Sequence, residues 1–148
     1  MTYQEKKSIV SIVAAILITG LYSAFKYAHY PAEELDAEAL YHYWGAFVLV
    51  LLLVSILAHI VISIVFNIVF RVTTREKEPG FADELDKLIE LKSNRNGFFV
   101  FILGFLLAMV SLVLNKPISN MFIILITAGF LSDITGSATK LYHYRKGV

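Results

Sequence analysis

The sequence predicts an all-α membrane protein in which four transmembrane helices form an antiparallel bundle, with an amphipathic cytoplasmic helix before the third span. Three observations lead to this fold class. Four uninterrupted apolar runs are long enough to cross a hydrocarbon core of about 30 Å as helices, which takes roughly 20 residues each. Basic residues gather almost entirely on one side of these runs, and 57% of the 148 residues are hydrophobic.

The composition excludes several classes of protein. Only 17% of the residues are charged, against roughly 25% in soluble domains. A soluble chain of 148 residues is too short to bury so much apolar surface in its own core. The net charge of +1 provides no field that would attract nucleic acid. The chain has no cysteine, which excludes disulfides, thiol catalysis and zinc–thiolate sites.

We place the spans at residues 8–26, 44–70, 97–115 and 118–139, within a single transmembrane domain that covers residues 1–148. The runs are continuous and do not alternate between apolar and polar residues, so they predict helices and not the strands of a barrel. The turn between the third and fourth runs covers only about residues 115–117, beginning at the last residue of span three, which predicts a tight helical hairpin.

The basic residues predict the orientation of the spans. Of the 13 basic residues, all but Lys26 and Lys116 fall in the N-terminal segment, in the loop 71–96 or in the C-terminal tail. Cytoplasmic segments of membrane proteins are enriched in Lys and Arg. We therefore expect a multi-pass protein of the inner membrane with both termini in the cytoplasm. Interfacial aromatic residues at the outer ends of spans one and two agree with this: Tyr22, Tyr27, Tyr30, Tyr41, Tyr43 and Trp44.

Polar side chains inside the spans are the candidate functional residues, because such groups are costly in a bilayer unless they face protein, water or a partner. Six of them form the predicted intramembrane polar cluster: Ser55, His59, Ser63, Asn67, Asp133 and Ser137. The four on span two recur every four residues and share one helical face. Residue counts from the outer ends of the spans put His59 and Asp133 at similar depths, so we expect them to interact directly or through water.

Several interpretations of this cluster stay open. The His59–Asp133 contact could be a structural hydrogen bond that fixes the bundle, or it could be a titratable relay or substrate contact. His59 could instead face a partner subunit. Asp133 could extend toward basic side chains at the inner interface: Arg71, Arg95 or Lys140.

Small residues mark two further helical faces, and small residues allow helices to approach closely. In span three, Gly97, Gly104 and Ser111 repeat every seven residues, with Ala108 beside them. Span one has such residues at intervals of four: Ser11, Ala15, Thr19 and Ser23. We expect both faces to serve helix packing.

The loop 71–96 carries six basic and six acidic residues and is interrupted by Pro79-Gly80. After the interruption, apolar residues recur at helical spacing among charged ones: Phe81, Leu85, Leu88 and Ile89. This pattern predicts an amphipathic helix of about three turns that leads into span three. Such a helix would lie in the lipid headgroups or would bind a soluble partner.

Two stretches in the second half of the chain resemble sequences of a known group of proteins. Residues 83–96 read DELDKLIELKSNRN and residues 133–147 read DITGSATKLYHYRKG. Together they resemble the DUF2178-like group of small bacterial four-span membrane proteins, where an acidic run precedes IELK and RN, and the last span ends in a carboxylate, Gly-Ser and LYxYRRG. Leu85 and Lys146 depart from that pattern, which has Arg at both places. The resemblance implies a four-span architecture, no chemistry, and pairing with a helix-turn-helix regulator in a stress or signalling module.

Two classes of function remain. In the first, the protein has no enzymatic activity and acts in the lipid bilayer through self-association and through a cytoplasmic regulatory protein that binds loop 71–96. The alternative is a small oligomeric transporter or proton-coupled channel that uses His59 and Asp133. We expect no metal, no cofactor and no nucleic-acid partner. A haem would need two histidines at one depth, which only His29 and His42 near the outer surface provide.

Overall fold

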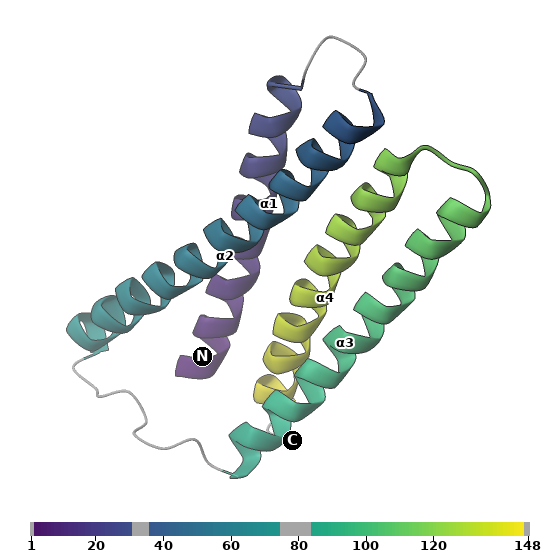
Figure 1. The fold of residues 1–148 in the computed structure, drawn as a ribbon. Coiled ribbons are helices and arrows are strands. Elements are labelled where there is room, and N and C mark those ends of the chain that lie inside the picture. The colour runs from purple at the N-terminus through teal and green to yellow at the C-terminus, as the bar shows by residue number, and fades with distance from the viewer. Residues whose placement is uncertain (1, 31–35, 75–83, 147–148) are drawn as a thin grey trace.

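The computed structural model describes residues 2–30, 36–74 and 84–146 of the chain. These residues form four long helices, α1 (Tyr3–Ala28), α2 (Ala37–Thr74), α3 (Glu84–Val113) and α4 (Ile118–Lys146). All four are long and apolar enough to cross a membrane. The helical, multi-pass character predicted from the sequence is therefore confirmed, and the four helices follow the order of the predicted spans (Figure 1).

Local sequence explains where the helices start and stop. Thr2 caps α1 by accepting a hydrogen bond from the Glu5 amide at 3.3 Å, and Asp36 caps α2 by accepting one from the Ala39 amide at 2.8 Å. At the end of α3, Asn115 adopts a left-handed conformation with φ of 54°. Lys116 donates its amide to the Ser111 carbonyl and Asn115 donates to the Leu112 carbonyl. This arrangement is a Schellman motif, and it turns the chain directly into α4.

The segment predicted as loop 71–96 is shorter than expected. Residues 71–74 continue α2, and residues 84–96 belong to the same uninterrupted helix as span three. The reason is local: residues 84–96 contain neither Gly nor Pro, and mostly good helix formers. The segment predicted to form an amphipathic helix is thus the first part of α3 in the described chain, while Phe81 lies outside the described residues.

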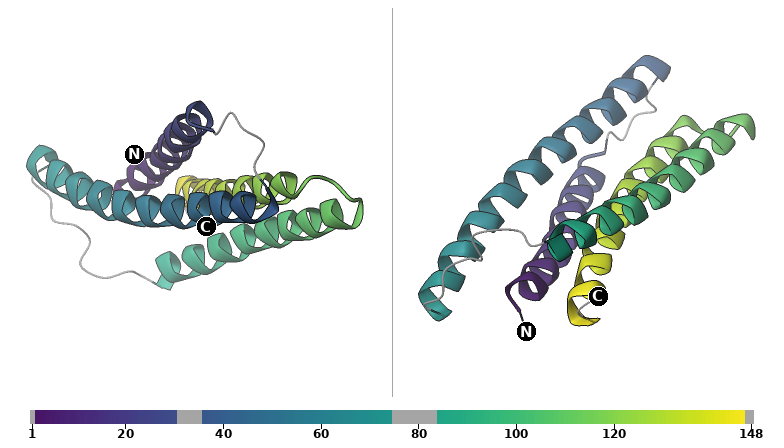
Figure 2. Two further views of the ribbon diagram at one scale, coloured as in Figure 1. Left: turned by 45° about the horizontal axis from the view of Figure 1, so that its top comes forward. Right: turned by 90° about the horizontal axis from the view of Figure 1, so that it is seen from below.

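Helices α3 and α4 make the closest pair (Figures 1 and 2). Later positions of α3 contact progressively earlier positions of α4. Ser132 Oγ donates to the Gly97 carbonyl at 2.8 Å, and further toward the turn, Gly104 lies against Ala128. The small residues predicted for packing in span three are indeed buried: Gly97, Gly104, Ala108 and Ser111.

Helix α2 is held mainly at its two ends. Near its start, the Trp44 ring stacks on Phe122 of α4 at 5.9 Å between ring centroids, and its Nε1–H donates to Ser119 Oγ at 3.1 Å. Near its other end it meets Tyr3 of α1, whose ring packs edge-on against Phe70 at 4.8 Å. Within the described residues α2 makes no close backbone approach to α3.

Both chain termini lie at one end of the bundle, which we call the terminal end (Figure 1). The opposite end, which holds the α3–α4 turn, is the turn end. Helix α2 contacts α4 at the turn end and leans toward α1 as it approaches the terminal end. This lean opens the space in which the candidate site lies.

Candidate functional site around Asp133

The α2 members of the predicted polar cluster have separate surroundings. Asn67 accepts a hydrogen bond from the Tyr3 hydroxyl of α1. His59 donates from Nδ1 to the carbonyl of Ser55, one turn earlier in its own helix, at 2.8 Å. Ser63 is half-buried. The stripe therefore serves in part to fasten α2 to α1, and the His59 ring has a partner within α2.

Asp133 has a different environment from the rest of the cluster. It is exposed on the surface of α4, and within the described part of the chain its carboxylate has no hydrogen-bond or ion-pair partner. Lys140, one of its predicted partners, pairs instead with Glu90 at 4.0 Å. Asp133 is thus an uncompensated carboxylate inside an apolar helix, a position in which a charge is expensive.

The contact between α2 and α4 fixes which residue of α2 is level with Asp133. Trp44 stacks on Phe122, and from this pair Ser55 and Asp133 lie the same number of residues further along their helices. His59 lies one turn deeper, about 6 Å. Residue counts from the outer ends of spans two and four do not reveal this offset, because the two spans do not begin at the same depth.

Asp133 lies at one end of an apolar groove of about 670 Å³. Residues of α2 and α4 form most of the lining of this groove, and Phe101 of α3 and Thr19 of α1 also line it. Apolar side chains form most of its walls, chiefly Val48, Leu49, Leu52, Leu125, Ile126 and Phe130. Its polar side chains are Thr19, Ser55 and Asp133, whereas His59 does not line it. The structure therefore brings Ser55 and Asp133 to one cavity and leaves His59 out of it, so the predicted His59–Asp133 coupling stays a prediction.

On its other side, Asp133 reaches a polar pocket of about 340 Å³ between α3 and α4, which we call the hairpin pocket. Ser137 and Lys140 also line this pocket. Both residues line a third cavity as well, the terminal pocket of about 230 Å³, where α1, α3 and α4 meet. Asp133 thus stands between an apolar cavity toward the turn end and two polar cavities toward the terminal end.

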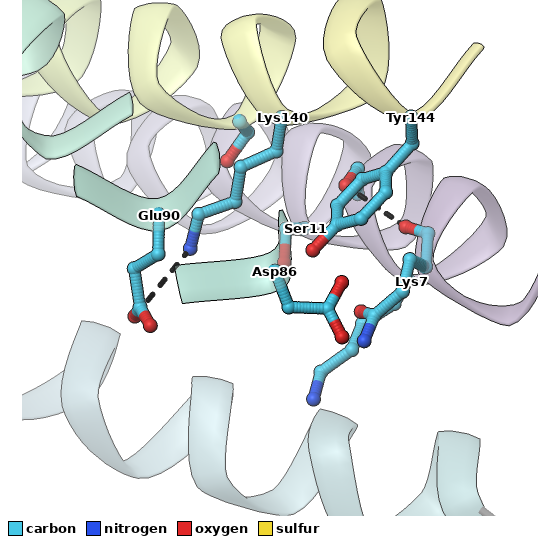
Figure 3. A pocket seen from close by; sticks show the side chains of 9 residues that line it. Lys7, Ser11, Asp86, Glu90, Lys140 and Tyr144 are labelled. Atoms are coloured by element: carbon cyan, nitrogen blue, oxygen red, sulfur yellow. Dashed lines mark hydrogen bonds and ion pairs between the residues drawn. The ribbon is translucent and has the colours of Figure 1, made fainter. Parts of the chain in front are cut away.

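Figure 3 shows the terminal pocket. Lys140 extends toward Glu90, and the Tyr144 hydroxyl points toward the Asp86 carboxylate. Lys7 and Ser11 of α1 add further polar groups. Positive and negative side chains balance one another here, so the pocket favours water or a neutral polar group over a single ion.

Sequence reasoning missed the part that the second half of α4 plays. Five of its residues follow one another at steps of three or four along a single face, and each lines at least one of the three cavities: Gly129, Asp133, Ser137, Lys140 and Tyr144. The periodicity was present in the sequence. It is hard to see because Lys140 and Tyr144 belong to the predicted tail and not to the span.

The residues of the predicted partner helix differ in their exposure. Leu85 is 40% exposed and Leu88 is 47% exposed, but Ile89 is fully buried inside the protein. Ile89 shares its face of α3 with Ser93 and Gly97, which pack inside the bundle. A partner could therefore reach the two leucines but not Ile89. Leu91, which the sequence analysis passed over, is 67% exposed beside them.

Within the described ranges, no group of three or more His, Asp or Glu side chains is placed to hold a metal ion. Comparison with known proteins adds no assignment: the chain matches no family model, no curated protein and no solved structure.

Proposed function

We propose that the protein is a multi-pass protein of the bacterial inner membrane, built as an antiparallel bundle of four transmembrane helices with both termini in the cytoplasm. Support comes from the position of both termini at one end of the bundle (Figure 1). The basic residues of the described chain concentrate at that end, apart from Lys26 and Lys116 near the turn end. Membership in the DUF2178-like group is part of this proposal.

Single cysteines test the orientation, because the chain has no cysteine of its own. A cysteine at Glu38, near the turn end, is expected to react with an impermeant maleimide in intact cells. A cysteine at Arg145, at the terminal end, is expected to react only after the membrane is opened. The reverse pattern would invert the orientation.

The protein acts, in our proposal, without catalysis, through self-association and through a cytoplasmic regulatory partner. The observation that carries this is the exposed row of leucines at the start of α3: Leu85, Leu88 and Leu91. Charged residues surround the row, including Lys87 and Arg95. A segment with so many charges does not enter the hydrocarbon core, so these leucines are available to a protein surface at the headgroup level.

Photo-crosslinking in living cells tests this function. A photoreactive phenylalanine analogue at Leu88 is expected to give an adduct heavier than the monomer. An adduct of twice the monomer mass indicates self-association, and any other mass identifies a partner by mass spectrometry. The matched control is Leu103 of the same helix, which is 62% exposed but lies within the apolar run. Absence of any adduct at Leu88, or equal adducts at both positions, contradicts the proposal.

A second candidate function, transport or proton-coupled conduction, is favoured by one observation. Asp133 lines both the apolar groove and the polar hairpin pocket, so a charge-bearing group there could meet both lipid and water. His59, the other predicted residue of this mechanism, lines none of these three cavities. A saturable proton flux in proteoliposomes that disappears in Asp133→Asn would support transport, and a flux equal to that of empty liposomes would contradict it.

A further inference from the structure

The apolar groove around Asp133 combines three properties of a ligand site. Its volume of about 670 Å³ lies within the range of roughly 300–1,000 Å³ that small-molecule pockets have. Its walls are almost wholly aliphatic and aromatic. A single ionisable group, Asp133, stands at one end. From the stacked Trp44–Phe122 pair to the level of Asp133 the groove extends along about 16 Å of helix.

We propose that the groove binds a hydrophobic monocation, with the apolar body of the ligand between α2 and α4 and its positive charge against the Asp133 carboxylate. Nothing in the described chain neutralises that carboxylate. The nearest basic residue along the same face of α4 is Lys140, which lies about 10 Å further along the helix and contacts Glu90. An uncompensated charge in a low-dielectric site favours a ligand of opposite charge strongly.

The same charge argues against other occupants of the groove. A second copy of the chain could insert a helix, but residues 8–25, 45–70, 97–113 and 118–139 contain no Lys or Arg. The second copy could therefore bring only His59 to this depth. A phospholipid chain would satisfy the apolar walls and leave the carboxylate unpaired. A divalent metal requires more carboxylate or imidazole ligands than the one that this groove offers.

Two further features fit a cation with an apolar body. Phe101, Phe122 and Phe130 line the groove, and the faces of aromatic rings attract cations. The groove lies where α2 and α3 stay apart, so it can open sideways toward the bilayer, in which hydrophobic cations partition. Ser55, level with Asp133, supplies a hydroxyl that can accept a hydrogen bond from an N–H of the ligand.

Binding of tetraphenylphosphonium to the purified full chain in nanodiscs tests the proposal, with tetraphenylborate as a probe of the same shape and opposite charge. We expect saturable binding of the cation at one molecule per chain and no saturable binding of the anion. Asp133→Asn should weaken cation binding at least tenfold, and Asp133→Glu should retain most of it. Asp86→Asn removes a carboxylate from the terminal pocket and should leave the affinity unchanged.

Equal binding of the two probes, or unchanged cation binding in Asp133→Asn, overturns the proposal. If Asp133→Asn does not fold, Leu52→Trp provides a second variant, because it fills the groove without changing its charge. Cation binding that survives a folded Leu52→Trp variant would place the site elsewhere and would also overturn the proposal. The assay requires neither self-association nor transport, so its failure leaves the crosslinking test of partner binding unaffected.

Discussion

The α3–α4 pair and helix α2 meet their neighbours with opposite kinds of side chain. Glycine, alanine and serine line the α3–α4 contact, and the Gly104 backbone comes so close that an added Cβ would lie 2.1 Å from Ala128 Cβ. Helix α2 uses large side chains, and Trp44 and Phe47 are the only buried side chains among its described residues. Small residues permit continuous backbone contact, whereas bulky residues hold α2 at its two ends and away from α3.

This difference separates two tasks within one bundle. The α3–α4 pair gains stability from van der Waals contact along its length, as expected for helices in a membrane. Helix α2 leaves a groove along α4 because, from its contact with Phe122 to its contact with Tyr3, it leans away from α4 and toward α1. A tightly packed pair thus supports a loosely packed helix, and the candidate site lies between them.

The largest effect is expected where the close pair is disturbed. Gly104→Ala should lower the free energy of unfolding by about 1–3 kcal/mol, because its Cβ overlaps Ala128. Gly20→Ala is the matched control, since an added Cβ at Gly20 meets nothing within 4 Å. There, alanine should be neutral or stabilising by about 0.5–1 kcal/mol. Thermal unfolding in detergent measures both variants.

A rescue variant makes this prediction sharper. Combining Gly104→Ala with Ala128→Gly removes the overlapping methyl group and should recover much of the lost stability. Similar effects of the Gly104 and Gly20 changes would mean that the close approach of α3 and α4 does not determine stability.

An intermediate effect is expected at the terminal anchor of α2. Tyr3→Phe removes the hydroxyl that donates to Asn67 and keeps the ring that packs against Phe66 and Phe70. The loss should be about 1 kcal/mol, as for one hydrogen bond. The end of α2 that contacts Tyr3 should also become more mobile. Spin labels on cysteines at Lys6 and Thr73 would report this as a broader distance distribution.

Tyr27→Phe serves as the control, because Tyr27 is 85% exposed at the turn end. It should change neither the stability nor the distance distribution. An unchanged distribution in Tyr3→Phe would show that aromatic packing alone holds this end of α2.

The two regions also differ in how well the sequence predicts them. Span lengths predicted all four helices, and the repeat of Gly97 and Gly104 predicted the packing face of α3, because small residues at regular spacing have one dominant use in a membrane helix. The partner face of α4 has a comparable repeat of small residues at intervals of four, Ala128, Ser132 and Gly136, which meet Gly104, Gly97 and Ser93 of α3. The sequence interpretation did not use this repeat, because it considered only the ionisable and hydroxyl side chains of span four.

The position of α2 could not be predicted in the same way. Its apolar residues surround the helix on all sides, so no periodicity identifies the face that meets α4. The depth of its polar residues relative to α4 depends on the Trp44–Phe122 stack, a contact between residues distant in the sequence. For this reason Ser55, and not His59, shares the groove with Asp133.

The smallest effect is expected for the pair of residues that the sequence predicted to interact. A double-mutant cycle of His59→Leu and Asp133→Asn should give a coupling energy below about 0.5 kcal/mol, because residues without a shared contact are close to additive. His59 already donates to the Ser55 carbonyl, and the groove that Asp133 lines does not include it. The cycle of Tyr3→Phe and Asn67→Leu is the positive control, with an expected coupling of about 1 kcal/mol from the hydrogen bond that these two side chains form. A His59–Asp133 coupling as large as this control would mean that α2 closes onto α4 in the membrane, which would fill the groove and favour the relay interpretation over the binding site.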